Sequence, residues 1–447
     1  MANSKTATAA GAYELISFKI KSLDGEEEGV ELNQIVTQWS FSESMFMSNI
    51  TGSVTVLDAE GIIRTLPIIG EELITIQWKD FYGDTQTKRF YCYGVDALGP
   101  AEESSENILS YRLNFTTIEH LTAHQQDVRQ SFANQLISDM VQSVFNTYYD
   151  TNDKEIEIEP TVGLQTYVIP TLTPAQTMLF LARKAYGGED STNNFRFFET
   201  KDKFFFCTPE YLKEKYKDTV TTEKAIEDNN LLFHTSGTAD DNTPLGQLRS
   251  QQTVSGISYG DPVNTLNEIS GGHLKTSMLE IDVLNHTTSR TVTEFEKILT
   301  NSKIDKLKIP HSSKFLETRM PITDEVYAIK DYNVPGIDKG NNKGNRHYPF
   351  YREVINSKKL FNINMAKHAI NCSIKGRNPL IPGMVIFLMV DLVEVGDPGR
   401  PDVLRDGLHM VMSVTNLFVE DEFTQLVSLT KGGLSGSSDR SLFKEKR

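Results

Sequence analysis

Residues 378–393 read NPLIPGMVIFLMVDLV, the most apolar stretch of the chain. The apolar run at 380–390 has 11 residues, whereas a membrane-spanning helix needs about 20, and Pro382 and Gly383 interrupt the run near its start. The run therefore predicts a strand at 384–390 with apolar residues on both faces. Such a strand must be covered on both sides, by its own core and by another layer or subunit.

Other short strands surround this run in the second half of the chain. Their apolar patterns predict strands at 253–258, 274–284, 369–375, 408–418 and 423–430. The segment LIPGMVIFLMV (380–390) also resembles IIGEELITIQW (68–78), because each has an apolar pair, a glycine and then a strand. A second strand and a closing strand follow each segment. The pattern favours an internal duplication, although a chance match between such short segments stays open.

Period-two patterning dominates the first half of the chain, between residues 13 and 119. It is clearest at 109–116, where four apolar residues alternate with four polar ones. The same patterning predicts strands at 16–20, 53–56, 74–78 and 88–95. Several short strands in succession favour a small antiparallel barrel or sandwich.

A helical period begins at Ser131. One helical stripe collects Phe132, Leu136, Ile137, Met140, Val141, Val144, Phe145 and Tyr148. A second helix is framed by Thr173 as its cap, Pro174 at its first position, Gln176 completing a capping box, and Gly187 after its end. The segments FRFFE (195–199) and KFFFCT (203–208) predict a hairpin packed on these helices. Together they predict an α+β insert.

The remaining segments carry weaker patterns. Residues 300–350 are rich in Pro, Gly, Asn and charge, which predicts loops, and the fragment at 334–349 is expected to be a long exposed loop of the kind that binds partners. A helix is expected at 351–367. The N-terminal stretch MANSKTATAAGA has no apolar segment behind a charged start, so we expect a flexible arm and no secretory signal.

Composition bounds the class of protein. A chain of 447 residues is long enough for about three domains, and 38% hydrophobic residues are enough to fill their cores. Lys and Arg number 45 against 60 Asp and Glu, and the resulting charge of −15 repels a phosphate backbone. Sequence-specific DNA reading is therefore disfavoured, and solubility is the simplest account of the charge. Cys92, Cys207 and Cys372 match neither a disulfide framework nor a zinc pattern, which indicates a reducing compartment.

Catalytic motifs are weak. The segment GISYG (256–260) has the G-x-S-x-G form of a nucleophile elbow with Ser258 as nucleophile, but the strand before it is polar and Asp261-Pro262 follows. We therefore expect a glycine-flanked strand end. His120 and His124 have the spacing of a zinc-binding helix, but Leu121 stands where a metalloprotease has glutamate and no third ligand is evident. Two solvated histidines at a strand-to-helix junction are the expectation.

Binding motifs are also missing from the sequence. The acidic segment DTNDKEIEIEP (150–160) lacks the glycine that a calcium-binding EF-hand requires, so it predicts a solvated loop and an edge strand. The loop GIDKGNNKG does not match a phosphate-binding loop, and no dinucleotide fingerprint is present. We therefore assign no catalytic, cofactor-binding or metal-binding residue and expect no cofactor.

The order of elements resembles the baseplate hub of contractile-tailed bacteriophages, which joins the central spike to the tail tube, and the related hub part of bacterial contractile secretion spikes. Three quoted regions carry the resemblance: SFSESMFMSNITGSVTVLDAEGIIRTLPIIGEELITIQW, TLTPAQTMLFLARKAYGG, and NCSIKGRNPLIPGMVIFL with GLHMVMSVTNLFVEDEFTQLVSLTKGG. The likeness covers residues 13–433.

The resemblance implies an α+β, mainly β fold with two tail-tube-like antiparallel β-barrels, a helical insert and a loop-rich region. The implied domains are a flexible arm at 1–12, a first barrel at 13–122, an α+β insert at 123–230, a second barrel at 231–295 plus 366–433, a loop-rich and helical connection at 296–365, and a flexible tail at 434–447.

The implied function is structural and non-enzymatic. A homotrimer presents six similar barrels in a ring, which adapts the threefold spike to the sixfold tail tube. Its partners are the central spike protein, a tail tube or tube-initiator protein and other baseplate proteins. Genomic DNA passes through an acidic lumen without specific binding, and no membrane insertion is expected. The protein is then located in the virion tail baseplate and assembled in the host bacterial cytoplasm.

Two features of the sequence depart from the pattern of the family, and two alternative functions stay open. The span 300–350 matches no motif of the family, and the ending GLSGSSDRSLFKEKR has neither β-helical repeats nor a lysozyme-like segment, so a separate spike protein must supply those parts. The first alternative is a tail-associated or cell-surface hydrolase, cleaving esters or polysaccharides with Ser258 or an acidic pair. The second is a sugar-binding β-protein, against which the presence of only two tryptophans argues mildly.

Overall fold

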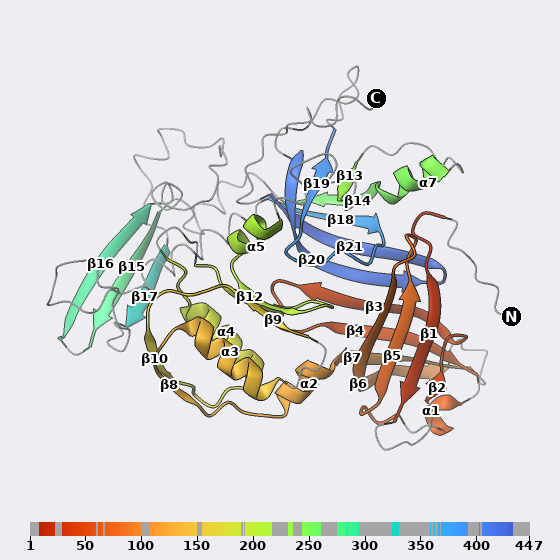
Figure 1. Ribbon diagram of the computed structural model, residues 1–447, viewed down its shortest axis with the longest axis horizontal. Helices are drawn as coiled ribbons and strands as arrows, with labels where there is room; N and C mark the ends of the chain where they lie inside the picture. The colour runs from red at the N-terminus through yellow and green to blue at the C-terminus, as the bar shows by residue number, and fades with distance from the viewer. Residues whose placement is uncertain are drawn as a thin grey trace.

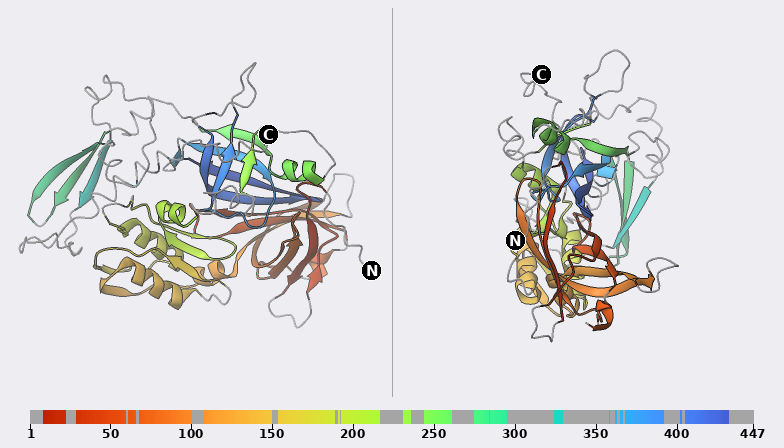
Figure 2. Two further views of the ribbon diagram at one scale, coloured as in Figure 1. Left: turned by 45° about the horizontal axis from the view of Figure 1, so that its top comes forward. Right: turned by 90° about the vertical axis from the view of Figure 1, so that its right-hand side faces the viewer.

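The computed structural model describes residues 9–22, 29–59, 61–65, 68–100, 108–149, 154–188, 191, 193–216, 231–235, 244–260, 275–283, 285–294, 324–329, 358, 362, 365–366, 368–391, 402 and 405–431. The fold is mainly β: a large, mostly antiparallel sheet of 13 strands curls into a half-barrel, and small sheets and helices lie beside it (Figures 1 and 2). The expected mainly β fold class is confirmed at this level. None of the described helices is long and apolar enough to cross a bilayer.

The first half of the chain supplies one end of the large sheet. Its elements are β1 (Glu14–Lys21), β2 (Val30–Glu31), β3 (Val36–Ser44), β4 (Thr51–Asp58), α1 (Ile62–Thr65), β5 (Leu73–Lys79), β6 (Thr85–Pro100) and β7 (Leu109–Thr117). The predicted strands in β1, β4, β5 and β7 are confirmed, and β6 extends beyond the predicted 88–95. The sequence analysis did not identify β3, whose nine residues end in the buried polar pair Glu43 and Ser44.

The second half supplies the other end. Its elements are β13 (Leu232–His234), α7 (Pro244–Gln251), β14 (Val254–Tyr259), β18 (Ala369–Lys375), β19 (Val385–Met389), β20 (Gly407–Val419) and β21 (Glu422–Thr430). The strands predicted at 253–258, 369–375, 384–390, 408–418 and 423–430 are all confirmed within a few residues. The strand predicted at 274–284 is β15 (Lys275–Asp282), which forms a separate sheet with β16 (Thr287–Glu294) and β17 (Asp324–Ile329).

A five-strand unit occurs twice in the large sheet. The first unit has the spatial order β3-β4-β7-β6-β5, and the second has β14-β18-β21-β20-β19. Both units follow the same chain order, since each begins with the outer strand, continues to its neighbour, and ends with a three-strand meander. The similarity between 68–78 and 380–390 places β5 and β19 in the same position of this order. The internal repeat suggested by the sequence is therefore present in the strand topology.

The two units are joined into one sheet by β3 and β20. These strands pair antiparallel from Ser413 opposite Ser44 to Val419 opposite Gln38. Figure 1 shows them side by side across the middle of the molecule. β20 can serve both units because its first residues pair with β19 and its later residues pair with β3 along the same edge.

Aromatic side chains from the second unit complete the core of the first. Phe418 of β20 stacks on Trp39 of β3, with ring centroids 3.7 Å apart, and Phe423 of β21 stacks on Phe418 at 4.1 Å. All three belong to the same buried cluster as Trp78. Because stacked aromatic pairs add to the burial of large apolar areas, this cluster fixes how the units meet.

The insert lies against the first unit. Its elements are α2 (Ile118–His124), β8 (Ser131–Gln135), α3 (Ile137–Tyr148), β9 (Ile156–Ile158), β10 (Gln165–Val168), α4 (Pro174–Lys184), β11 (Arg196–Glu199), β12 (Phe204–Cys207) and α5 (Pro209–Tyr216). Thr173 and Gln176 form the predicted capping box at the start of α4, and β11 and β12 form the predicted hairpin. Both predictions are confirmed.

The helix expected from Ser131 begins later, at Ile137. Residues Ser131–Gln135 form β8, which pairs with β10, and Asn134 has a φ of 51° that no helix accepts. The apolar pattern predicted the start of this helix too early because a single buried aromatic residue, Phe132, fits either a strand or a helix.

The apolar strand at 384–390 is covered within its own chain. Val385 and Phe387 are 1% and 4% exposed, and Ile386 and Leu388, on the opposite face, are 1% and 0% exposed. The sequence-based hypothesis that one face meets a neighbouring subunit is therefore wrong for this strand. β13 and β20 pair with its two edges, and the α5 residue Leu212 lies beside Gly383 at its start. The loop expected at 334–349 lies outside the described residues, as does most of the helix expected at 351–367.

The aromatic contact between the units predicts a large effect of one substitution. Phe418→Ala removes a fully buried ring from the first core, so the free energy of unfolding should fall by about 3–5 kcal/mol. Urea unfolding followed by tryptophan fluorescence measures the change, since Trp39 and Trp78 lie in the same cluster. Leu426→Ala on β21 is the control, because Leu426 is 48% exposed and should cost less than about 1 kcal/mol. Equal losses from the two variants contradict the described packing.

Candidate functional site

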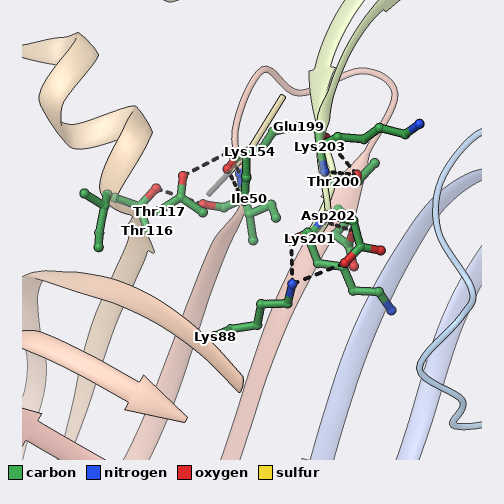
Figure 3. A network of polar contacts seen from close by, with 12 residues as sticks. Ile50, Lys88, Thr116, Thr117, Lys154, Glu199, Thr200, Lys201, Asp202 and Lys203 are labelled. Carbon is green, nitrogen blue, oxygen red and sulfur yellow. Dashed lines mark hydrogen bonds and ion pairs between the residues drawn. The ribbon is translucent and has the colours of Figure 1, made fainter. Parts of the chain in front are cut away.

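A buried carboxylate fastens the insert to the first unit. Glu199, at the end of β11, has no exposed side-chain surface and accepts hydrogen bonds from the backbone N–H of Ile50 at 3.0 Å and the hydroxyl of Thr117 at 2.9 Å (Figure 3). Lys154 completes the contact, with its ammonium nitrogen 2.6 Å from Glu199. Burial lowers the pKa of Lys154, but Glu199, through its charge and its hydrogen bond, together with the charges of Glu119 and Glu43 outweighs burial, so the net pKa is raised. The contact is therefore an ionised buried pair with satisfied oxygens.

The turn between β11 and β12 makes a second contact with the first unit. Lys88 of β6 donates to the carbonyl of Lys201 at 2.7 Å and to the carboxylate of Asp202 at 3.2 Å (Figure 3). The backbone N–H of Lys201 donates to Glu43 of β3 at 2.8 Å. Burial raises the pKa of Glu43 and lowers the pKa of Lys201, and each group partly opposes the shift of the other. These shifts favour the neutral forms at this contact.

A chain of buried hydrogen bonds continues from Glu43 into the second unit. Asn416 of β20 donates to Glu43 at 3.3 Å, and Gln425 of β21 donates to Asn416 at 2.8 Å. Gln425 then exchanges two hydrogen bonds with the backbone of Arg377, each 3.0 Å long. We call Lys201, Glu43, Asn416, Gln425 and Arg377 the polar spine. It connects the insert, the first unit and the second unit.

The turn after β18 holds the two units together at another point. Asn378 accepts a hydrogen bond from the indole N–H of Trp78 at 2.8 Å, and its own amide donates to the carbonyl of Asp84 at 2.7 Å. Its backbone N–H donates to Asp80 at 3.0 Å. Asn378 therefore binds the hairpin between β5 and β6 and positions it against the turn after β18.

The candidate nucleophile Ser258 lies in a strand. β14 pairs with β18, Ser258 stands opposite Asn371, and Ser258 is exposed. Gly256 has a φ of +59° at an irregularity in this pairing, which explains the glycine without a nucleophile elbow. The expectation of a strand end in place of an elbow is confirmed, since Ser258 and Tyr259 still pair with β18 and Ser258 does not stand at the sharp turn that an elbow needs.

The histidine pair lies in α2, directly after β7, as expected. The rings of His120 and His124 are 5.8 Å apart, and His124 is exposed. Burial, and then the charge of His124, lower the pKa of His120. No group of three or more potential metal ligands occurs within the described ranges. The three cysteines are buried and free.

The acidic segment has a role that the sequence analysis missed. Residues 150–153 lie outside the described part, but β9 is an edge strand, as expected, of the sheet β11-β12-β9. Glu157 binds the ammonium groups of Lys203 and Lys215, and Lys154 binds Glu199. The segment therefore contributes ion pairs to the insert and to its attachment.

The polar spine was also missed, although a signal was present. Asn416 lies between the buried residues Val414 and Phe418 on one face of β20, and Gln425 lies between Phe423 and Val427 on one face of β21. A polar residue at a core position of each of two consecutive strands indicates that the two side chains meet, because buried amides need partners.

The buried pair predicts a double-mutant result. Glu199→Gln leaves Lys154 charged in a site where its side chain is only 10% exposed, so the free energy of unfolding should fall by about 3 kcal/mol. Adding Lys154→Met should recover part of the loss, because no unpaired charge remains. Urea unfolding at pH 7 measures the two single variants, Glu199→Gln and Lys154→Met, and the double variant. Asp202→Asn is the control, since Asp202 is 52% exposed and its loss should cost less than about 1 kcal/mol. Strict additivity of the two substitutions would falsify the coupling.

A buried histidine beside the junction predicts acid sensitivity. Burial lowers the pKa of His409 to about 4, and the charges of Lys431 and His368 act in the same direction. As pH falls from 6.5 to about 4, the unfolded chain takes up the proton and the folded chain does not, so stability falls. The loss attributable to His409 is on the order of 2–3 kcal/mol. His409→Gln should flatten this part of the stability profile, whereas His124→Gln at the exposed position should not.

The fold matches two solved tail proteins. The tail protein from Neisseria meningitidis MC58 aligns with a TM-score of 0.55 and 8% identity, covering 95% of this chain and 98% of that chain. The 43 kDa tail protein of prophage MuSo2 from Shewanella oneidensis aligns with a TM-score of 0.51 and 10% identity, covering 94% and 98%. Comparison of the sequence with protein-family models and with curated proteins finds no match. The resemblance to phage tail proteins is confirmed in the fold, which this chain shares with both tail proteins over nearly its whole length.

Proposed function

We propose that this chain is a structural, non-enzymatic hub of a phage tail baseplate. Three copies form a ring, and each copy contributes two tube-like barrels built on the five-strand units. Six similar units around one axis meet a sixfold tail tube on one side, and three copies meet a threefold central spike on the other. The repeated strand order within one chain is the observation that carries this proposal.

The proposed domains follow the sequence expectations. A first barrel at 13–122 and a second at 231–295 plus 366–433 carry the insert at 123–230 and the connection at 296–365, with an arm and a tail at the two ends. Within the second range, β15 and β16 form their own sheet with β17 and are an extension of this barrel. The proposed partners are the central spike, a tail tube or tube-initiator protein, and other baseplate proteins. The location is the virion tail, after assembly in the host cytoplasm.

Two further features support an adaptor. The fold is shared with proteins that are described as tail proteins. The chain has a net charge of −15, and acidic walls around an axial channel repel the backbone of passing DNA. The alternative, a tail-associated hydrolase, loses its best motif because Ser258 lies within a strand.

Solution mass tests the trimer. Light scattering over a range of protein concentrations, with and without a candidate spike protein, should give three times the chain mass of 50.3 kDa. Negative-stain images of the same sample should show six lobes around an axial opening. A mass that stays at one chain under every condition, or a particle with three lobes and no opening, contradicts the proposal.

Enzyme assays test the rival function. Ser258→Ala should leave esterase and cell-wall hydrolysis at the background of the wild type, because Ser258 has no catalytic surroundings. Ser255→Ala on the same strand is the matched control. A hydrolytic activity that the wild type shows and Ser258→Ala specifically loses would favour the hydrolase.

A further inference from the structure

Within the described part of the chain, two strand edges pair with no other strand after the units have joined. β20 of the second unit pairs with β3 of the first, and the equivalent strands in the repeat are β6 and β14. β14 is the outermost strand of the large sheet, and β6 pairs beyond residue 91 only with β7, as far as the described strands show. Each of these two edges is therefore one half of a junction of the same kind.

The correspondence between β6 and β20 holds residue by residue. Tyr91 ends the pairing of β6 with β5, and Met410 ends the pairing of β20 with β19. Each strand then has an irregularity one residue further on, between Cys92 and Gly94 in β6 and between Val411 and Ser413 in β20. Beyond this irregularity, the edge of β20 that no longer pairs with β19 pairs with β3. The bulge that releases β20 to its neighbour is thus also present in β6.

The correspondence between β14 and β3 follows from their inner neighbours. Ser258 and Tyr259 stand opposite Asn371 and Ile370 of β18, and Ser40 and Phe41 stand opposite Ser53 and Gly52 of β4. The two rows are equivalent in the repeat because β18 and β4 pair in matching register with the closing strands β21 and β7. Gly260 then takes the place of Ser42, and its N–H bonds to the carbonyl of Ala369.

Side chains at the two unpaired edges have larger exposed fractions than the side chains at equivalent positions inside the formed junction, as expected where a partner strand is missing. Phe41, inside the formed junction, is 1% exposed, whereas Tyr259 is 37% exposed. Met412, the bulge residue of β20, is 6% exposed, whereas Tyr93, the bulge residue of β6, is 52% exposed. Tyr93 is thus largely exposed, and Tyr259 stays more than one-third exposed although the guanidinium carbon of Arg405 lies 3.9 Å from the centroid of its ring, as at edges that lack a partner strand.

We propose that β14 of one copy pairs antiparallel with the outer edge of β6 in a second copy of this chain, in the register of β3 on β20. Thr415 faces Ser42 within the chain, so Asp96 of one copy faces Gly260 of the next. The contact is heterologous, since it joins two different edges, and such contacts close into rings. The inference rests on the proposed trimer and names the strands that hold it together.

We take a second copy of this chain as the partner because every copy carries both β14 and the outer edge of β6. Each copy offers β14 to one neighbour and β6 to the other, so a ladder of the kind that joins the two units inside the chain recurs between chains. A strand from an unrelated protein would satisfy one edge and leave the other open.

Engineered disulfides test the register. Antiparallel partners have Cα atoms about 4.5–5.5 Å apart, within the range that a disulfide spans. Asp96→Cys combined with Gly260→Cys should give a covalent trimer after mild oxidation, seen on a non-reducing gel. A mixture of the two single variants should give only covalent dimers. The three native cysteines are buried and should not interfere.

The chain supplies its own positive control. Ser42 and Thr415 have hydroxyl oxygens 2.9 Å apart across the internal junction, so Ser42→Cys with Thr415→Cys should form a disulfide within one chain and no oligomer. Hydrogen exchange on the wild-type protein is a second readout that needs no substitution. Amides that point to the outer edge at 94–96 and 256–259 should exchange at least about tenfold more slowly in the assembled protein than in the dilute monomer, whereas the amide of Gly260, already bonded to Ala369 within the chain, should change little.

The outcomes separate this inference from the proposed function. A trimer by light scattering that forms no link between Asp96→Cys and Gly260→Cys, while the internal control closes, overturns the strand pairing and leaves the trimer. Unchanged exchange at both edges on assembly has the same meaning. A chain that is monomeric under every condition overturns the trimer itself. Protection of one edge only, by another baseplate protein, overturns the second copy as occupant.

Discussion

Seven residue pairs between β3 and β20 hold the two units of this chain in one continuous sheet. The ladder alone does not fix the arrangement, because strand pairing tolerates a shift in register. Register is fixed by side chains on the buried face of the two strands, where Phe418 stacks on Trp39 and Asn416 bonds to Glu43. A shift by one residue would turn the ring out of the core and separate the amide of Asn416 from its carboxylate partner. The junction thus combines apolar burial with polar specificity at neighbouring positions.

The polar spine makes the packing at this junction specific. Buried amides and carboxyls contribute little net stability when paired, but they are costly when unpaired, so they exclude alternative packings. Lys201 in the insert, Glu43 in the first unit and Asn416 in the second form one hydrogen-bonded series. The insert therefore cannot move on the first unit without disturbing the junction between the units. A rigid connection of this kind suits the proposed hub.

The two units share a strand order although their core residues differ. The first core is filled by Trp39, Trp78 and Phe115, whereas the second is filled mainly by aliphatic side chains such as Leu388, Val414 and Leu429. Strand order and bulge position are kept, because they decide which edge is free to pair. The core residues can vary as long as volume and patterning are preserved. Geometry at the strand edges is therefore a better sign of the duplication than the residues themselves.

The amino-acid sequence by itself determined the local elements. Alternation in β1, β5 and β7, the two-sided apolar run of β19 and the Thr173 capping box were sufficient, because each depends on neighbours within a few residues. The sequence did not determine β3, the strand at 131–135, or what covers β19. Only the tertiary structure decided that Glu43, Asn416 and Gln425 meet, since these side chains come from three strands and the distance along the chain between Glu43 and Asn416 is 373 residues. Contacts over such separations depend on which strand edges lie together, and no local pattern of residues encodes that.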